Sequence, residues 1–341
     1  MAQPGGATAS ATRPGDPQPS HRPPALVWAA LVIVYVVWGS TYLGIRISVE
    51  TIPPYTGAAL RFAVAGILLG AVIAARRGPA ALRVTGRQLL SASVIGILLL
   101  AGGNGMVVVA EAHRVPSGVA ALLIATVPLL VVVLRLVTGD RPRLATLAGV
   151  LVGFGGLAEL VASAAGGGAT VPVGWALLVV AAAGSWSLGS FLSRPLPLPP
   201  DPFVASVYEM IAGAVVLGLG GMVAGERLPV HVSTRSWLAL GYLVVAGSVI
   251  AFTAYVWLLG NAPISLVSTY AYVNPAVAVA LGALVVHEPI TPAVLLSGLV
   301  IVVGVVLVVS TERRRKASPS SAPSTASSTA SEVRSSRSSH S

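Results

Sequence analysis

The stretch WGSTYLGIR at residues 38–46 returns in altered form as WSLGSFLSR at residues 186–194. At this offset of 148 residues the paired positions are Trp38 and Trp186, Arg46 and Arg194, Arg61 and Glu209, and Arg87 and Arg235. Matches of aromatic and charged positions at one fixed spacing indicate an internal repeat. We therefore expect two copies of one structural unit.

The repeat continues beyond this stretch at an offset of 147 residues. VPSGVAALLIATVP at 115–128 then lies over APISLVSTYAYVNP at 262–275. The paired helix-breaking residues are Pro116 and Pro263, Pro128 and Pro275, and Pro142 and Pro289. The second half of each copy is thus predicted to share its helix breaks with its counterpart.

The composition predicts a membrane protein, since 55% of the residues are hydrophobic and only 9% are charged. Soluble domains carry about 25% charged residues. A helix needs about twenty apolar residues to cross a bilayer. Ten such runs are expected at 25–45, 55–75, 88–110, 116–137, 143–161, 171–193, 203–223, 236–259, 262–285 and 291–310. They are continuously apolar instead of alternating, which excludes a barrel.

These runs predict an all-α integral membrane fold of ten transmembrane helices arranged as two inverted five-helix repeats. Each repeat has an odd number of helices, so the second must enter the membrane from the opposite side. The expected domains are a first repeat at 25–161 and a second at 171–310. Tails at 1–24 and 311–341 have the composition of disordered segments.

Lys and Arg residues predict the orientation, because cytoplasmic loops retain them. With a cytoplasmic N-terminus, sixteen basic residues fall on the inner side and four on the outer side, with Arg61 inside a helix. Both termini are therefore expected in the cytoplasm, with the chain in the inner or plasma membrane. The cluster 313–316 is interpreted as the positive inner end of the last helix.

Several function classes find no support in the sequence. The chain has no cysteine, and its five histidines lack the i, i+4 spacing of helix-borne metal ligands. No nucleophile or metal motif of an enzyme occurs, so we expect no enzymatic activity, no cofactor and no metal. The net charge of +10 is divided among chain ends and loops, which argues against nucleic acid.

The chain resembles the EamA-domain transporters of the drug/metabolite transporter superfamily over roughly residues 28–310. WGSTYLGIR, LRF at 60–62, VPSGVAALLIATVPLL at 115–130 and AYVNPAVAVALGALVVHEPIT at 271–291 are similar to the repeat signature of that family. SWSLGSFLSRPLPLP at 185–199, with YEM at 208–210, resembles its YedA-type branch. The resemblance implies a ten-helix inner-membrane carrier that moves metabolites such as amino acids, commonly outward. The second copy departs from the first at Leu188, where the first has Ser40.

Arg61 and Glu209 are the ionisable residues placed deepest in the predicted helices. A charge at mid-membrane costs about 2.5–3.5 kcal/mol on insertion scales, so each needs a partner, a cavity or a use. We expect Arg61 toward the outside and Glu209 toward the inside, too far apart to pair. In one hypothesis Arg61 binds a substrate carboxylate, and Glu209 binds an amine or a proton. In the other, both residues form only local structural bonds to carbonyls and loop charges.

Polar and aromatic residues near helix centres form a second group of candidates for a central cavity. They are Trp38, Ser40, Thr41, Asn104, Trp186, Ser190, Tyr255, Tyr270, Tyr272 and Asn274. Pro128 and Pro275 are the candidate hinges, because each frees a backbone carbonyl one turn earlier. Glu111, His113, Arg114, His287 and Glu288 are interpreted as solvated helix ends.

We expect a secondary active transporter, and more specifically an exporter of small metabolites such as amino acids, working by alternating access. The alternatives are a carrier that expels cationic drugs and a membrane sensor or scaffold without transport. The expected partners are a small-molecule substrate and the lipid bilayer. The sequence leaves open whether protons or a counter-substrate drive transport. The sequence leaves monomer or homodimer open.

Overall fold

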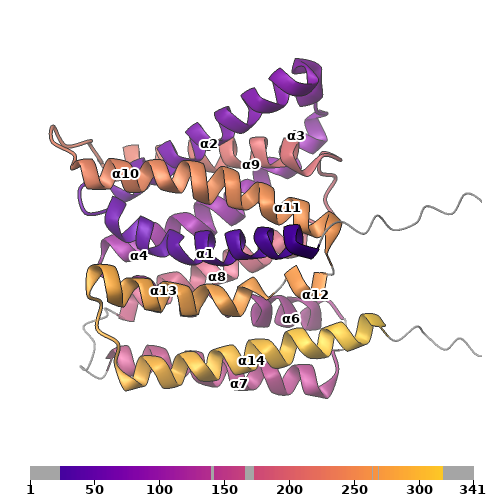
Figure 1. Cartoon of the computed structure of the whole chain (residues 1–341), viewed down its shortest axis with the longest axis vertical. Helices are drawn as coiled ribbons and strands as arrows, with labels where there is room; N and C mark the ends of the chain where they lie inside the picture. Colours follow the sequence, from indigo (N-terminus) through magenta and orange to yellow (C-terminus); the bar gives the residue numbers. More distant parts are fainter. Residues whose placement is uncertain (1–23, 140–141, 166–172, 263, 268, 318–341) are drawn as a thin grey trace, which may run out of the picture.

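The computed structural model describes residues 24–139, 142–165, 173–262, 264–267 and 269–317. Across these segments the chain forms helices and short connections, without a strand (Figure 1). Most of the expected tails at 1–24 and 311–341 lie outside the described residues. The helix that closes the chain continues to Ala317, through the basic cluster.

The first five spans lie close to their expected positions. They are α1 (Pro24–Ser48); α2 (Pro54–Arg77), followed by the short η1 (Pro79–Leu82); α3 (Gly86–Gly96), η2 (Ile97–Gly105) and α4 (Met106–Ala112); α5 (Ser117–Ile124) and α6 (Val127–Val137); and α7 (Leu144–Ala165).

The second five repeat this order. They are α8 (Val173–Leu192); α9 (Pro202–Val223); α10 (Thr234–Tyr242), η3 (Leu243–Ile250) and α11 (Ala251–Asn261); α12 (Ile264–Val267) and α13 (Tyr270–Val286); and α14 (Pro292–Ala317). In the described part of the chain, nine helices are long and apolar enough to cross a membrane, and α13 is a shorter apolar helix. The all-helical, ten-span prediction is confirmed.

The third and eighth spans contain π-helical centres, which the expectation of uniform helices did not include. These centres, η2 and η3, occupy corresponding places in the two repeats. A π-helix has a wider turn and leaves side chains and carbonyls less regularly stacked, and it is frequent at functional sites. Both centres contribute residues to the cavity described below.

The fourth span is interrupted in its middle. α5 ends at Ile124 and α6 begins at Val127, with Pro128 in its first turn. The Thr126 hydroxyl donates to the Leu123 carbonyl at 2.6 Å within the break. Because proline has no N–H, Pro128 suits a helix start better than a helix interior.

Close helix contacts hold the two repeats together. α2 packs along α9, and α7 packs along α14. α3 approaches α9 so closely at Gly96 that a Cβ atom there would overlap the backbone of Glu209. Glycine at such a crossing lets two helices approach within the width of a side chain.

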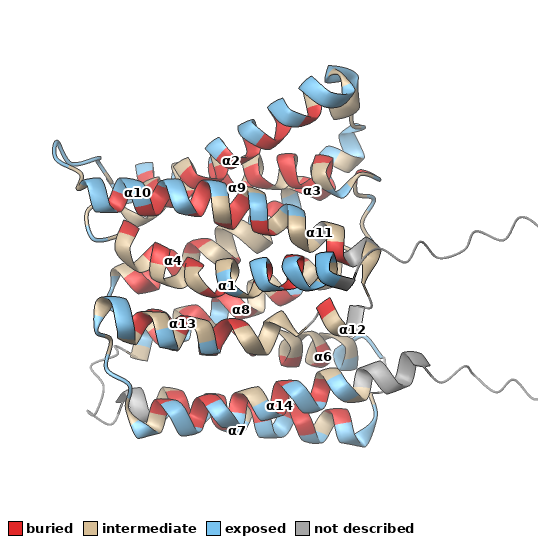
Figure 2. Cartoon of the chain, viewed as in Figure 1, coloured by how far each residue is buried: buried red, intermediate tan, exposed pale blue. Residues whose placement is uncertain are grey.

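The outer faces of the bundle are apolar. Figure 2 shows exposed residues along the outward sides of α2, α7 and α14 and buried residues on the sides that face other helices. The exposed residues include Ile67, Val72, Leu151, Leu299 and Val303. Exposed apolar surface of this extent suits a lipid environment and confirms a multi-pass membrane protein.

Both ends of the described chain lie at one edge of the bundle, where α1 begins and α14 ends (Figure 1). We call this edge the near end. The opposite edge, where α1 ends at Ser48, is the far end.

Candidate functional site

A cavity of ≈ 210 Å³ lies in the middle of the bundle. It is lined by both repeats, through α1, α2, the third and fourth spans, α8, α9, η3, α11 and α13. Its walls are mostly apolar and aromatic, and among the lining residues Arg61 carries the only charge. A largely apolar cavity with few polar groups is the usual form of a small-molecule site.

Most of the predicted site residues line this cavity. Those that do so are Trp38, Thr41, Arg61, Asn104, Trp186, Tyr270 and Asn274, together with the two candidate hinge residues, Pro128 and Pro275. The structure thus brings together residues from distant parts of the sequence. That they bind a substrate stays a prediction.

Arg61 lies on α2, seven residues from the far-end start of that helix, and is only 6% exposed. Its Nε donates to Ser248 Oγ at 3.0 Å, and one terminal nitrogen donates to Asn104 Oδ1 at 3.4 Å. Both partners are neutral. Arg61 therefore keeps its positive charge without a protein carboxylate beside it.

The π-helical centres position these two partners. Asn104 belongs to η2 and Ser248 to η3, so each repeat offers one polar side chain to the same guanidinium. Gly103 in η2 leaves room for an aromatic ring, since a Cβ there would stand 2.8 Å from Trp186. The GGNG sequence thus leaves room for Trp186 against η2, and both Trp186 and Asn104 line the cavity.

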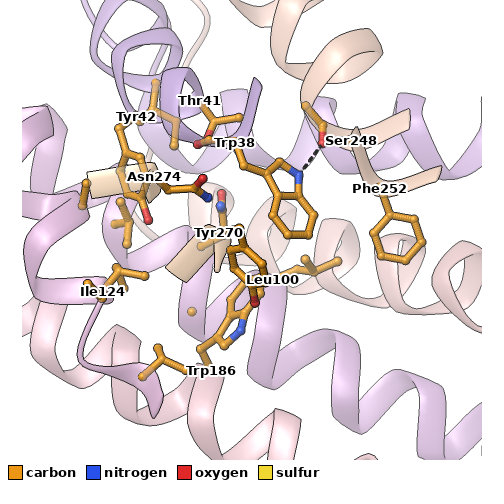
Figure 3. A pocket seen from close by; sticks show the side chains of 18 of the residues that line it. Trp38, Thr41, Tyr42, Leu100, Ile124, Trp186, Ser248, Phe252, Tyr270 and Asn274 are labelled. Atoms are coloured by element: carbon orange, nitrogen blue, oxygen red, sulfur yellow. Dashed lines mark hydrogen bonds between the residues drawn. The ribbon is translucent and has the colours of Figure 1, made fainter. Parts of the chain in front are cut away.

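Aromatic rings cover another wall of the cavity. Trp38 lies 5.0 Å from Tyr255 and 5.3 Å from Tyr270 between ring centroids, and the two tyrosines are 5.7 Å apart edge to face. The Trp38 indole nitrogen donates to the Gly247 carbonyl at 3.2 Å. Figure 3 shows Trp38, Tyr270 and Trp186 grouped around the pocket.

Asn274 supplies a polar group one helical turn after Tyr270 on α13. With its amide oriented to satisfy its neighbours, the nitrogen donates to the carbonyls of Tyr270 at 3.2 Å and Tyr35 at 3.3 Å. The side-chain oxygen then remains an acceptor. Asn274 lines the cavity, so this acceptor is close to any bound molecule.

Five predicted residues do not line the cavity. Ser40 bonds to the Val37 carbonyl and the Tyr242 hydroxyl, and Tyr255 supports the aromatic wall from behind. Ser190, Tyr272 and Glu209 also lie outside the lining.

Glu209 lies on α9, seven residues from the near-end start of that helix, and forms no ion pair with Arg61. At about 1.5 Å per residue, each of these two residues is roughly 10 Å from its own end of the bundle. The separation expected between them therefore follows from the inverted order of the repeats. A role for Glu209 in binding stays a prediction.

The predicted site residues did not include several that line the cavity, among them Tyr42, Phe62, Met210, Ser248 and Phe252. Tyr42 could have been found, since residues 38, 41, 42 and 45 follow the helical period on one face of α1 and all four line the cavity. Ser248 gave no such signal, because its orientation depends on η3.

Two carboxylates close the far end by binding helix N-termini. Glu226, after α9, accepts hydrogen bonds from the Tyr55 and Thr56 amides at 3.1 and 2.8 Å at the start of α2. Glu288, after α13, accepts from the Ser117 amide at 2.8 Å and its hydroxyl at 2.9 Å at the start of α5. Glu288 is therefore a helix cap, and its charge is placed where a helix dipole favours it.

Comparison with known proteins agrees with this architecture. The EamA-like transporter family matches residues 25–162 and 173–310. The inner membrane transporter YedA of Escherichia coli K12, itself uncharacterized, is 42% identical over 284 residues, which cover 83% of this chain and 90% of YedA.

Two relatives carry more specific names. A probable terminal-alkyne amino-acid exporter of Streptantibioticus cattleyicolor is 31% identical over 86% of this chain and 96% of its own. A probable amino-acid metabolite efflux pump of Escherichia coli K12 is 23% identical over 84% and 95%, respectively.

A solved crystal structure superposes with a TM-score of 0.58 at 25% identity and covers 86% of this chain and 99% of its own. Fold, repeats and sequence similarity agree with the resemblance seen in the sequence. The chain belongs to the EamA-like transporter family.

Proposed function

We propose that this protein exports small carboxylate-bearing metabolites of the amino-acid type across the inner membrane by alternating access. One observation carries the proposal: a buried guanidinium, that of Arg61, faces a cavity whose described lining holds no carboxylate. A buried charge is costly unless it is paired, so a substrate carboxylate is the partner that this cavity lacks.

The neighbouring groups support an amino acid. Arg61 and Asn104 together present N–H donors, which suit the two oxygens of a carboxylate. Asn274 and the tyrosine hydroxyls supply acceptors for an amine, and the aromatic wall suits an apolar side chain. The names of the two exporter relatives support the same substrate class and the outward direction.

A carrier for cationic drugs is the second hypothesis, and the same geometry disfavours it. A cation entering the cavity would meet the Arg61 charge and no lining carboxylate to offset it. Aromatic rings attract cations only by about 0.5–2 kcal/mol, which is small beside an uncompensated like charge.

We also propose the orientation: the near end is cytoplasmic, because Lys and Arg concentrate in the loops on that side. The apolar flanks then contact lipid. Glu209, half-buried and near the cytoplasmic end, remains a proposed contact for an amine or a proton on the inner side.

Counterflow into proteoliposomes tests the substrate class. The panel pairs leucine and phenylalanine with the amines that lack their carboxyl groups, isoamylamine and phenethylamine, and adds nucleosides and cationic dyes. We expect saturable uptake of the amino acids alone, abolished in Arg61→Gln and partly kept in Arg61→Lys. Arg87→Gln, at an exposed arginine of the near end, is the matched control.

Uptake of the amines or dyes by the wild type, unaffected by Arg61→Gln, would support the cationic-drug hypothesis instead. No uptake of any compound by correctly inserted protein would favour the sensor hypothesis.

A further inference from the structure

Glu111 is completely buried at the far end of the bundle, in the last turn of α4. Among the residues that the structure describes, neither of its carboxylate oxygens has a hydrogen-bond partner. The interpretation of Glu111 as a solvated helix end is therefore wrong, whereas His113 and Arg114, two and three residues further on, are exposed. A buried carboxyl group without a partner calls for an explanation.

Few charges surround this group. α1 contributes Arg46 and Tyr42, and the loop after α13 contributes Glu288, all within electrostatic range of Glu111. α8, η2 and α5, which also pack around α4, contain no ionisable side chain. α2 contributes Tyr55 at its far-end start and Arg61 in the cavity beneath. Glu111 thus has one like charge and one opposite charge within range at the far end.

The opposite charge is close but not engaged. The Arg46 guanidinium donates to the backbone carbonyl of Glu111 at 3.4 Å and forms no ion pair with its carboxylate. Long arginine side chains reorient readily, so a small rotation would bring the two charged groups together. In this conformation Arg46 and Glu111 are therefore neighbours whose charged groups do not form an ion pair.

The neutral carboxyl is the form that suits this conformation. An ionised carboxylate buried without partners carries a large desolvation cost, whereas a protonated one does not. A metal cation would need further oxygen ligands, and the nearest carboxylate, Glu288, already accepts bonds from Ser117 and Gly118. A proton is therefore the cation that this site fits.

We propose that Glu111 is the proton-binding site that couples this carrier to the proton gradient, and that Arg46 is its ion-pair partner in the alternate conformation. When the far end opens, a proton from water binds one Glu111 oxygen and the ion pair with Arg46 breaks. When the cavity opens to the near end instead, the proton leaves through it to water on that side, and the carboxylate pairs with Arg46 again. Tyr42, which lines the cavity and lies near Glu111, connects the two sites.

The coupling role rests on the proposed transport function, but the proton site itself can be tested without any substrate. In pH-difference infrared spectra of the purified protein, we expect the carbonyl stretch of a protonated carboxyl, lost in Glu111→Gln. Because Glu209 is itself a proposed proton contact, these spectra are compared in a Glu209→Gln background, where the Glu111 band should remain. A band that persists in Glu111→Gln, or no such band at any pH, would overturn the proposal.

A second measurement follows the opening of the far end. The chain has no cysteine, so a single cysteine at the fully buried Val115 reports far-side access to a membrane-impermeant thiol reagent. Because the thiolate is the reactive form, this rate is divided by that of a cysteine at the exposed Val230, in the far-end loop between α9 and α10. We expect the ratio to depend on pH, and this dependence to vanish in Glu111→Gln. In Arg46→Gln, which removes the partner of the ionised form, the transition should shift to higher pH.

His113 needs its own control, because its imidazole lies two residues from Glu111 and stacks on Trp175 with ring centroids 3.7 Å apart. Labelling in His113→Gln should retain its pH dependence, and loss of that dependence there would overturn the assignment to Glu111. Glu111→Asp replaces Glu111→Gln if the latter does not fold, and it should keep the infrared band.

Transport then separates the two proposals. In vesicles, Glu111→Gln should keep counterflow and lose accumulation driven by a pH gradient. If no panel compound is transported, the proposed function fails, while the infrared and labelling results still decide the proton site. If Glu111→Gln keeps gradient-driven accumulation, the coupling role fails and the proposed function stands.

Discussion

The Arg61 guanidinium and the Ser248 hydroxyl meet across 3.0 Å, and this bond joins α2 of the first repeat to the π-helical centre of the second. It holds the charged group in one orientation within the cavity. Arg61 is thereby positioned before a substrate arrives, which lowers the entropic cost of binding.

Ser248→Ala should weaken substrate binding without removing the charge. A hydrogen bond to a charged group contributes about 1.5–3 kcal/mol, and the Asn104 contact keeps part of the orientation of Arg61, so we expect KM to rise by about tenfold with kcat little changed. Counterflow kinetics measure both. Ser193→Ala, whose hydroxyl bonds only to the Ser190 carbonyl near the end of α8, is the control. An unchanged KM would mean that Arg61 is oriented by other contacts.

Gly96→Ala should destabilise the fold, because the added methyl group would overlap the Glu209 backbone where α3 crosses α9. Overpacking of this type costs about 1–3 kcal/mol. The melting temperature in detergent should fall. Gly155→Ala, at a glycine with open space around it, should leave the melting temperature the same or raise it. Equal effects of the two substitutions would contradict the close crossing.

Glu288→Gln should loosen the far end, since charge-assisted bonds to the start of α5 would become neutral ones. Such bonds contribute about 1.5–3 kcal/mol. We expect a lower melting temperature and faster labelling of a cysteine at Val115. Glu50→Gln removes an exposed pair with Arg235 at 3.8 Å and should change little, because surface pairs contribute about 0.2–1 kcal/mol.

Pro128→Ala should change turnover more than binding. Alanine at this position allows the fourth span to continue across the break at 125–126, which proline favours. If the break is used in the conformational cycle, kcat falls while the affinity for substrate is kept. Pro292→Ala, at the first turn of α14, is the matched control. A drop in affinity with unchanged kcat would contradict a hinge.

The spans could be predicted because each is a continuous apolar run, and burial in lipid leaves helix as the structure that satisfies the backbone. Many residues that line the cavity could be predicted for a related reason, because a polar residue such as Asn104 inside an apolar span needs a polar surrounding. Tyr42 follows from the helical period once Trp38 is placed on the cavity side.

Glu111 could not be placed, because a glutamate one residue before the end of a span resembles a solvated helix end. Its burial depends on the neighbours that cover it, and the sequence of α4 does not contain them. The π-helical centres were also missed, although one sign was present. The repeat offset changes from 148 to 147 between Arg87 and Pro116, within the span where η2 has nine residues and η3 eight.

The two repeats are alike in path but unlike in charge. Arg61 faces the cavity from the first repeat, whereas Glu209, its partner in the repeat alignment, lies outside the lining. When two such halves exchange positions, one positive charge takes a different depth in the electric field of the membrane. A full crossing of 100 mV by one charge amounts to about 2.3 kcal/mol, and a partial crossing to a share of it. In a carrier that works by alternating access, the resting voltage would therefore bias the direction in which the empty carrier faces.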